Sequence, residues 1–279
     1  MKTNSFAFQG VNGAYSEQAG KNVFPDAKSL PCSTFEEMFA CVRDDEADIA
    51  LVPIENSQAG RVADTQRLIP DSDLNIIGEY FLEVRHNLLA VPGTNINDIK
   101  RVHSHEQGIA QCRNKIIKLN KQMVIAADTA GSAKKISELN NKEDAAIASS
   151  LAAEIYNLDV LEANFQDAEH NVTRFLIMSK DKSDIEPSES NIITTLVFVV
   201  RSIPASLYKC LGGFASNGVN ITKLESYIHP QGFDVAQFYI DFEGHPKNNS
   251  VKLALEEMKF FCKEIKILGV YKKSNFRKK

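Results

Sequence analysis

The sequence predicts an α/β protein built in two parts. Short apolar segments alternate with segments of helical periodicity through about the first 180 residues, which favours α/β units around largely parallel sheets. A polar stretch then interrupts the pattern, and the remaining residues show another order of strands and helices.

The first segments predict a strand, a glycine turn and a helix. Ser5–Phe8 is expected to be a strand, after which Gly10 and Gly13 turn the chain into a helix whose start Ser16 can cap. Asp48–Pro53 is a short apolar run of the kind buried on both faces of a parallel sheet. Its proline is expected to end that strand.

A further helix is predicted from Gln107, because apolar residues recur there at spacings of three and four. The residues of this face are Ile109, Cys112, Ile116 and Leu119. Further strands are expected near Met123–Ala126, Ala145–Ala148 and Phe175–Met178.

The C-terminal part is predicted to have the order βαββαβ. Ser183–Asn191 is polar and contains a proline, so the main linker is placed there. A β-branched strand at Ile192–Val200 follows, then a helix that begins at Pro204 and stops at Gly218. The later elements are strands around Val219–Ile228 and Phe233–Phe242, a helix around Ser250–Cys262 and a strand at Ile265–Tyr271. This order is the ferredoxin-like arrangement.

Composition limits the classes of function. With 279 residues, 43% apolar and 24% charged, the chain can form two or three modules with separate cores. The formal net charge of -4 argues against a nucleic-acid binder, which needs a basic face. No apolar run approaches the ~20 residues that span a bilayer, and no apolar leader is evident, so we expect a cytoplasmic protein without membrane contact. The basic tail, Lys272 to Lys279, is expected to be solvated.

Cysteines and histidines offer weak signals for metal or nucleophilic chemistry. Cys112 could be a nucleophile, but its place on an apolar helix face favours a packed thiol. His103 and His105 lie at strand spacing and could suggest a metal, yet no third ligand follows at a recognisable spacing. The five cysteines are scattered, odd in number and without CxxC spacing, so buried free thiols are expected: Cys32, Cys41, Cys112, Cys210 and Cys262.

Polar clusters follow several of the predicted strands. Because ligands of open α/β sheets bind beyond the carboxyl ends of the strands, these clusters are the candidate site. Each has a structural alternative: a strand-to-helix turn for the glycines, a helix cap for Asn56 and Ser57, and a surface turn for Thr173 and Arg174, expected just before a strand. The chain lacks GxxxxGK[ST] and GxGxxG, which argues against nucleotides. The clusters are Gly10–Ser16, Glu55–Ser57, Ser104–Gln107, Asp128–Thr129 and Asn171–Arg174.

Taken together, these segments resemble the prephenate dehydratase family over essentially the whole chain. The order and spacing carry the resemblance, and the Pro-Ile-Glu-Asn-Ser and Thr-Arg-Phe elements are the most diagnostic. The matching segments are Phe8–Ser16, Val52–Ser57, Ser104–Gln107 through Gln111–Cys112, Asp128–Ala130, Ala145–Ser149 and Asn171–Phe175.

The resemblance implies a two-lobed catalytic region like the periplasmic binding proteins, followed by an ACT domain of ferredoxin-like fold. It places the catalytic region at residues 1–182, with lobe one at about 1–80 plus 166–182 and lobe two at about 81–165. It places the ACT regulatory domain at 191–279.

The resemblance also implies roles for particular residues. Thr173 is assigned to hydrogen bonding or proton relay at the leaving hydroxyl, with Glu55 organising the site and Asn56 orienting the substrate. Arg174 is a candidate partner for a substrate carboxylate, or a tie between the lobes. The other expected substrate contacts are Ser16, Ser57, Ser104, Gln107, Gln111, Thr129 and Phe175.

In this family the ACT segments form a phenylalanine site at a subunit interface, which implies a homodimer or homotetramer and feedback inhibition. Two positions depart from the family pattern at the effector site: Tyr227-Ile228 stands in place of Arg-Pro, and Ala205 in place of glycine. The implied regulatory residues are Ala205, Ser206, Leu207, Asn220, Ile221, Thr222, Glu225 and Ser226.

The implied activity is conversion of prephenate to phenylpyruvate, carbon dioxide and water without a cofactor. Arogenate dehydratase is the nearest alternative, since its substrate differs only by an amino group in place of the side-chain keto oxygen. A non-catalytic amino-acid-sensing ligand-binding protein is the alternative from another class. Thr173, Asn56 and Gln111 argue against it, because a sensor would not need the full set.

Overall fold

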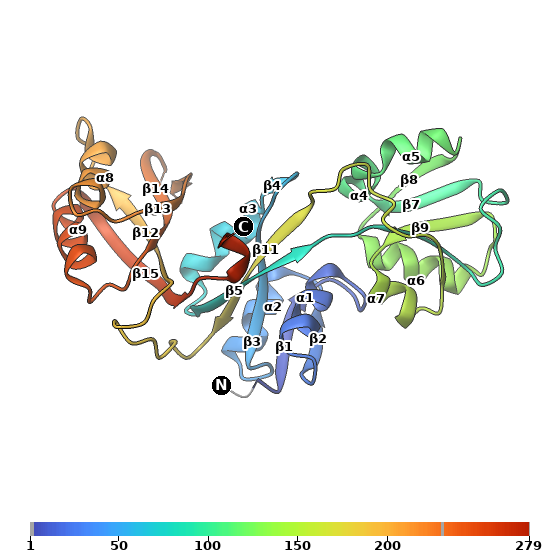
Figure 1. The fold of residues 1–279 in the computed structure, drawn as a ribbon, viewed down its shortest axis with the longest axis horizontal. Coiled ribbons are helices and arrows are strands. Elements are labelled where there is room, and N and C mark those ends of the chain that lie inside the picture. Colours follow the sequence, from blue (N-terminus) through green and yellow to red (C-terminus); the bar gives the residue numbers. More distant parts are fainter. Residues whose placement is uncertain (1–2, 230–231, 279) are drawn as a thin grey trace. The chain divides into compact units, whose positions relative to one another are not determined.

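The computed structural model describes residues 3–229 and 232–278, which belong to two compact units (Figure 1). The first unit comprises Met1–Gln66 and Tyr80–Phe175, and the second comprises Arg67–Glu79 and Leu176–Lys279. Strands β5 (Asn75–Glu83) and β11 (Val172–Ser179) each begin in one unit and end in the other. Among the described residues, no helix has the length and apolar character that crossing a membrane requires.

The first lobe of the first unit is a sheet in the order β11-β3-β1-β2, with β4 beside β3. Strand β1 is parallel to both of its neighbours, as expected of α/β units. Its strands and helices are β1 (Ser5–Gln9), α1 (Tyr15–Val23), β2 (Lys28–Cys32), α2 (Phe35–Arg43), β3 (Ile49–Asn56), β4 (Gly60–Arg61) and α3 (Ala63–Leu68).

The second lobe has its own sheet, in the order β10-β6-β9-β7-β8. Apolar side chains of α4 and α5 pack on one cluster of strand residues, and those of α6 and α7 pack on another. Figure 1 shows these helix pairs on opposite faces of the sheet. The elements are β6 (Asn87–Ala90), β7 (Arg101–His105), α4 (Glu106–Gln111), α5 (Arg113–Lys118), β8 (Gln122–Ala126), α6 (Thr129–Leu139), β9 (Asp144–Ala148), α7 (Ser150–Ile155) and β10 (Asp159–Glu162).

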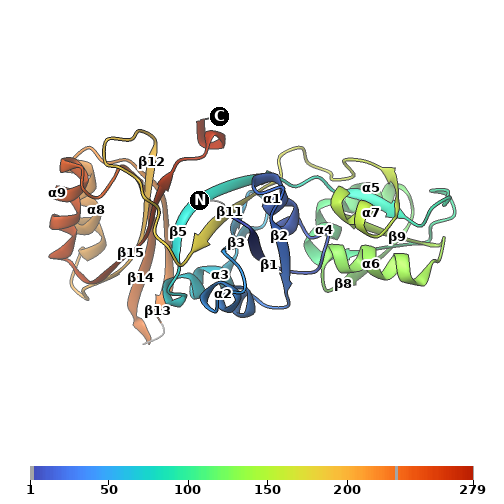
Figure 2. The same cartoon turned by 90° about the horizontal axis from the view of Figure 1, so that it is seen from below.

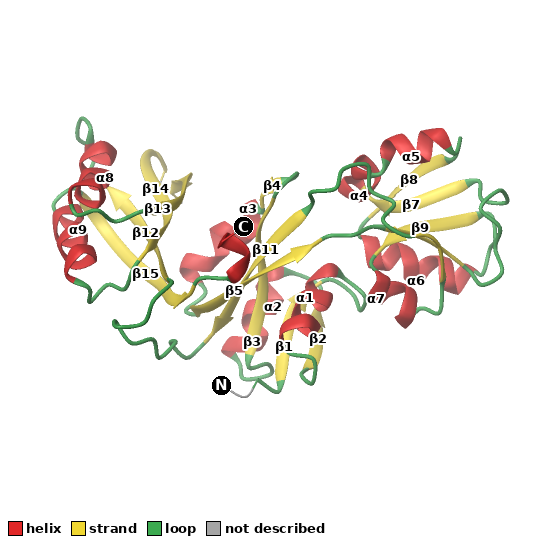
Figure 3. Ribbon diagram, in the orientation of Figure 1, coloured by secondary structure: helices red, strands yellow, loops and turns green. Residues whose placement is uncertain are grey.

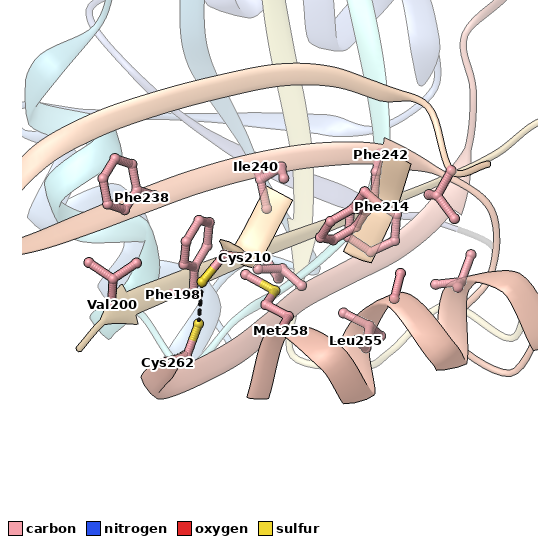
Figure 4. Packing of buried hydrophobic residues seen from close by; sticks show 14 residues of the cluster. Phe198, Val200, Cys210, Phe214, Phe238, Ile240, Phe242, Leu255, Met258 and Cys262 are labelled. Atoms are coloured by element: carbon pink, nitrogen blue, oxygen red, sulfur yellow. Dashed lines mark hydrogen bonds between the residues drawn. The ribbon is translucent and has the colours of Figure 1, made fainter. Parts of the chain in front are cut away.

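The second unit contains the predicted βαββαβ order, and α8 and α9 lie side by side on one face of its strands (Figure 2). Its core joins aromatic residues of β12 and β14 to both helices, with Cys210 and Cys262 in sulfur contact at 3.5 Å (Figure 4). The elements are a 3-10 turn (Ile69–Asp71), β12 (Ile192–Val200), α8 (Ser206–Ser216), β13 (Ile221–His229), β14 (Gly232–Glu243), α9 (Asn249–Lys259), β15 (Cys262–Lys272) and a 3-10 turn (Asn275–Lys278).

The α/β fold class is confirmed, with a two-lobed first part and a ferredoxin-like second part. The predicted linker is also irregular, since the residues between β11 and β12 form neither helix nor strand (Figure 3). Gly218 adopts the left-handed φ of +65° expected after a helix. Ala205 has a left-handed φ of +61° immediately before α8, a conformation that favours the glycine usual in the family.

Several predicted boundaries are wrong. Pro53 lies inside β3, which continues to Asn56; its ladder with β1 covers Ile49 to Leu51, so the missing N–H of the proline falls outside that pairing. Ala14, not Ser16, precedes the first turn of α1, and the helix expected from Pro204 begins at Ser206. The helix expected from Gln107 is two short helices that meet at Cys112, although Ile109, Cys112 and Ile116 are buried as predicted.

The basic tail is not fully solvated, so that prediction is wrong for Arg277. Its guanidinium contacts both oxygens of Glu79, at 2.7 and 2.9 Å, and lies 3.3 Å from Asp241. Both carboxylates are fully buried side chains, whereas Arg277 is 14% exposed. The carboxylates lie on β5 and β14, far from the tail in sequence. The basic pattern of the tail therefore does not indicate that Arg277 pairs with them.

Candidate active site

A cavity of about 400 Å³ lies in the first unit and is lined by residues of both lobes. Of the residues predicted to contact a substrate or to be catalytic, seven line it. They are Ser16, Asn56, Gln107, Gln111, Thr129, Thr173 and Phe175. The cavity therefore brings together side chains from five different segments of the chain.

Thr173 and Asn56 meet at the first-lobe side of the cavity. Thr173 and Phe175 alternate on β11, so both can face the cavity while Arg174 between them points to the other side of the sheet. The Asn56 amide nitrogen donates to Thr173 Oγ1 at 2.9 Å and to Asn171 Oδ1 at 2.7 Å. The strand expected from Phe175 begins earlier, at Val172, so Thr173 and Arg174 lie within it and the alternative of a surface turn does not hold.

The hydrogen bonds continue from Asn171 into the second lobe. Asn171 Nδ2 donates to Gln111 Oε1 at 2.9 Å, and the same oxygen lies 2.7 Å from His86 Nε2. His86 Nδ1 is 2.7 Å from the Tyr15 hydroxyl, on the first turn of α1. A continuous series of hydrogen bonds thus links six side chains from Tyr15 to Thr173.

The loop before α1 is anchored where it approaches the second lobe. Gly13 has a left-handed φ of +89°, and a Cβ at this position would lie 2.8 Å from Ala152 Cα, so only glycine fits. Ser149 Oγ donates to the Gly13 carbonyl at 2.6 Å, and the buried Glu17 accepts from the Gly13 N–H at 2.6 Å. These contacts position Tyr15 at the cavity.

Four predicted site residues do not line the cavity. Arg174 is 1% exposed and its Nη1 donates to Glu55 Oε1 at 3.1 Å, so these two form an internal ion pair. Ser57 Oγ accepts from the Val172 N–H at 2.9 Å, and the buried Ser104 donates to the Ile147 carbonyl at 2.8 Å. Their expected contacts with substrate stay predictions, and their positions support roles in holding β3, β7, β9 and β11 in place.

Few ionisable side chains line the cavity among the described residues. Among the described residues that line it, Arg61 on β4 is the only arginine or lysine. Burial lowers the pKa of His86, which therefore stays neutral at pH 7, although its hydrogen bond with Gln111 acts in the opposite direction. His105 caps α4, where its Nδ1 accepts from the Gln107 N–H at 3.3 Å.

His103 and Cys112 lie outside the cavity lining. His103 Nε2 is 2.8 Å from Asp144, and no group of three or more His, Cys, Asp or Glu side chains suited to a metal occurs in the part of the chain that the structure describes. Burial raises the pKa of the Cys112 thiol to about 12, which leaves it protonated and unsuited to nucleophilic attack. The buried-thiol interpretation is supported for Cys112.

We expect Asp144→Asn to lower the free energy of unfolding by about 2 kcal/mol at neutral pH. Arg101 Nε donates to Asp144 at 2.6 Å and, with His103, holds the pKa of that carboxyl down at about 2. A lowered carboxyl pKa stabilises the fold above its unfolded-state pKa, and this contribution is lost as pH falls. Urea unfolding should therefore give a constant difference from the unsubstituted protein between pH 7 and about 5, which shrinks from about pH 4 towards pH 2. A difference that does not depend on pH would contradict the assignment.

Sequence reasoning left five polar residues of the cavity lining unassigned, one of which, His105, it considered only as a possible metal ligand. Tyr15 and Asn171 lie within quoted motifs but were not assigned to the site, and Arg61 and His86 lie outside every motif. Arg61 follows the Glu55–Ser57 cluster by a few residues, a proximity that could have drawn attention to it. His86 stands alone before a short apolar strand and carries no such signal.

The predicted regulatory residues all belong to the second unit. Ala205, Ser206 and Leu207 form the start of α8, and Ser206 is buried. The others lie just before or within β13, where Asn220 donates to Glu243 at 3.1 Å and Thr222 accepts from Arg277 at 3.2 Å. The Tyr227-Ile228 pair, which differs from the family pattern, belongs to β13, but the side chain of Ile228 lies outside the described part of the structure.

The fold and the cavity define a two-lobed α/β protein with a site for a small polar ligand. The family model described as prephenate dehydratase matches residues 6–183. The chain therefore belongs to the prephenate dehydratase family, a family of dehydratases.

Relatives and solved structures agree with this family. The chain is 45% identical over 273 residues to a bifunctional N-acyl-homoserine lactone acylase/prephenate dehydratase of Komagataeibacter europaeus, covering 98% of this chain and 97% of that protein. It is 39% identical over 276 residues to arogenate dehydratase/prephenate dehydratase 2 of Arabidopsis thaliana, a match that covers 95% of this chain and 72% of that protein. A crystal structure of the Arthrobacter aurescens prephenate dehydratase with L-Phe superposes with a TM-score of 0.87 at 32% identity. The superposition covers 96% of this chain and 90% of that one.

Proposed function

We propose that this protein is a prephenate dehydratase, which converts prephenate to phenylpyruvate, carbon dioxide and water. Loss of the ring carboxylate as carbon dioxide supplies the electron pair that makes the ring aromatic, and the 4-hydroxyl leaves with a proton as water. The protein must hold a dianion, keep the cleft poor in water and assist the departing oxygen. The proposal needs no cofactor.

The hydrogen bonding of Thr173 is the observation that carries this proposal. Its Oγ1 already accepts a hydrogen bond from Asn56, and its own hydrogen has no acceptor among the described residues. A threonine hydroxyl is too weak an acid to ionise, but a positioned hydroxyl can donate to an oxygen as it gains negative charge. Arg61 offers a counter-charge to a substrate carboxylate at the same cavity.

The test is turnover of purified full-length protein with prephenate, followed as phenylpyruvate, and in parallel with arogenate, followed as phenylalanine. We expect prephenate to be the better substrate by kcat/KM. Absence of turnover with both substrates would refute a dehydratase function.

Arogenate is the second candidate substrate, because the Arabidopsis relative carries both dehydratase names. The two substrates present the same ring carboxylate and hydroxyl, so the groups around Thr173 would serve either. A kcat/KM that favours arogenate would replace the first proposal with this one.

An acylase activity is a candidate because the Komagataeibacter relative, matched along nearly its whole length, carries that name as well. Release of homoserine lactone from an N-acyl-homoserine lactone, measured on the same preparation, tests it. Hydrolysis that survives substitution of Thr173 would indicate a site distinct from the one described here.

We further propose that residues 1–182 are the catalytic region and residues 191–279 an ACT domain that binds L-phenylalanine in a homodimer or homotetramer. The L-Phe complex of the Arthrobacter protein and the βαββαβ order support this proposal. The effector would then act by favouring a less competent arrangement of the cavity residues. Isothermal titration calorimetry that detects no binding of phenylalanine would overturn it.

A further inference from the structure

His86 is buried and hydrogen-bonded through both ring nitrogens, yet the proposed chemistry makes no use of it. It is 2% exposed, with Nδ1 2.7 Å from the Tyr15 hydroxyl and Nε2 2.7 Å from Gln111 Oε1. Such a histidine can exchange protons or fix the orientation of its partners. The identity of those partners decides between these roles.

The partners dictate where the imidazole carries its proton. An amide oxygen can only accept, so Nε2 must donate its hydrogen to Gln111. In the neutral ring Nδ1 is then an acceptor and takes the hydrogen of Tyr15, which at 2.7 Å is closer than the competing Arg85 carbonyl at 3.1 Å. Tyr15 thereby selects the tautomer that donates to Gln111.

The orientation of the Gln111 amide agrees with this tautomer, and the donor contact from Asn171 on the other side requires the same orientation. Its oxygen accepts hydrogen bonds from His86 and from Asn171, so both partners of this oxygen are protein side chains. The amide nitrogen of Gln111 has no acceptor among the described residues, and Gln111 lines the cavity. Its N–H groups are therefore what a ligand meets.

The remaining amide oxygens are also used internally. Asn171 Oδ1 accepts from the Asn56 amide, and Asn56 Oδ1 accepts from the backbone N–H groups of Gln58 and Ala59 at 2.9 and 2.8 Å. Thr173 accepts from Asn56 as well. Along the series, hydrogens of Gln111 and Thr173 are left for the cavity, whereas the oxygens of Gln111 and Asn56 each already accept two hydrogen bonds and that of Asn171 accepts one.

We infer that His86 is a positioning residue which holds the Gln111 carboxamide with its N–H groups towards the ligand, so that the series presents hydrogen-bond donors to the cavity. The ligand class is a small molecule with carboxylate or departing oxygens. With the amide reversed, an oxygen would face the anionic group instead. The choice of substrate in the test rests on the proposed function.

The test compares three substitutions in the full-length protein. His86→Gln places an amide N–H near the position of Nε2, His86→Asn reaches only towards the Nδ1 side, and His86→Leu removes both contacts. We expect kcat/KM for prephenate to fall about 10- to 100-fold in the Asn and Leu variants, the effect of one misplaced donor, and to be largely retained in His86→Gln. His245→Asn removes another buried histidine, in the second unit, and should leave kcat/KM unchanged.

Two kinetic outcomes would overturn the inference. Unchanged kcat/KM in His86→Leu would show that the orientation of Gln111 does not depend on His86. Equal loss in the Gln and Leu variants would show that the imidazole itself is needed, since glutamine cannot exchange protons but can donate a hydrogen bond.

A spectroscopic readout keeps the inference testable apart from the proposed function. In ¹⁵N-histidine-labelled protein near pH 7, we expect the His86 proton on Nε2 and an unprotonated Nδ1. Tyr15→Phe should weaken this preference. A proton on Nδ1 would overturn the inference even if the protein turned over no dehydratase substrate, whereas missing turnover with the expected tautomer would refute only the function.

Discussion

Thr173→Ala is expected to lower kcat for prephenate by about 10² to 10⁴, the typical contribution of one positioned general acid or donor. The hydroxyl is held by Asn56 at 2.9 Å and lines the cavity, so its removal takes away the donor to the departing oxygen without opening the first-lobe sheet. Steady-state assays of phenylpyruvate formation check the expectation.

Thr173→Ser is the matched control, because it keeps the hydroxyl and removes only a methyl group. It should retain most of kcat. Circular dichroism of both variants establishes that the fold is kept. Near-normal turnover in a folded Thr173→Ala protein would remove Thr173 from the mechanism.

The second large effect concerns stability. We expect Arg277→Ala to lower the free energy of unfolding of the second unit by about 3–5 kcal/mol, because the substitution takes a cation away from two buried carboxylates. Arg277 contacts both oxygens of Glu79 and approaches Asp241, and neither carboxylate side chain is exposed. The chain contains no tryptophan, so urea unfolding is best followed by far-ultraviolet circular dichroism.

Lys272→Ala is the control for loss of a cation in the same unit. Lys272 pairs with Glu189 at 2.7 Å, but its side chain is 67% exposed, and such a solvent-screened surface pair contributes far less to stability than a buried one. Adding Glu79→Gln and Asp241→Asn to Arg277→Ala should recover part of the loss, since neutral amides leave no buried charge. Equal effects of the Arg277 and Lys272 substitutions would contradict this account.

The tail shows where reading charge patterns along a chain fails. A cluster of lysines and arginines near a terminus is usually solvated, and that expectation ignored which one of them could reach a buried carboxylate. Glu79 is 198 residues from Arg277 in sequence, and nothing around Glu79 marks it as needing a cation. Only the packing of β5 beside β15 in one sheet brings the two together.

At the cavity, too, sequence reasoning predicted positions along the chain but not the contacts between them. Asn56 and Thr173 were candidates because they lie next to the end or the start of a predicted strand, and the family resemblance added Gln111. Their mutual geometry was not predictable, since Asn56 and Asn171 are 115 residues apart and Asn171 and Gln111 are 60 apart. His86, which joins the series to Tyr15, has no local pattern that distinguishes it from a core histidine.

Resemblance of motifs to a known family supplied most of the predicted residues at the cavity. The sequence by itself determined the fold class, the βαββαβ order of the second part and the irregular linker. These properties follow from local periodicity and turn chemistry, which neighbouring residues encode. The tertiary structure alone decided that Arg174 pairs with Glu55, that Arg277 is held by buried carboxylates, and that Gln111 presents its amide hydrogens. The physical reason is that hydrogen bonds and ion pairs depend on atoms within about 3 Å of each other, and chain folding sets such distances between residues far apart in sequence.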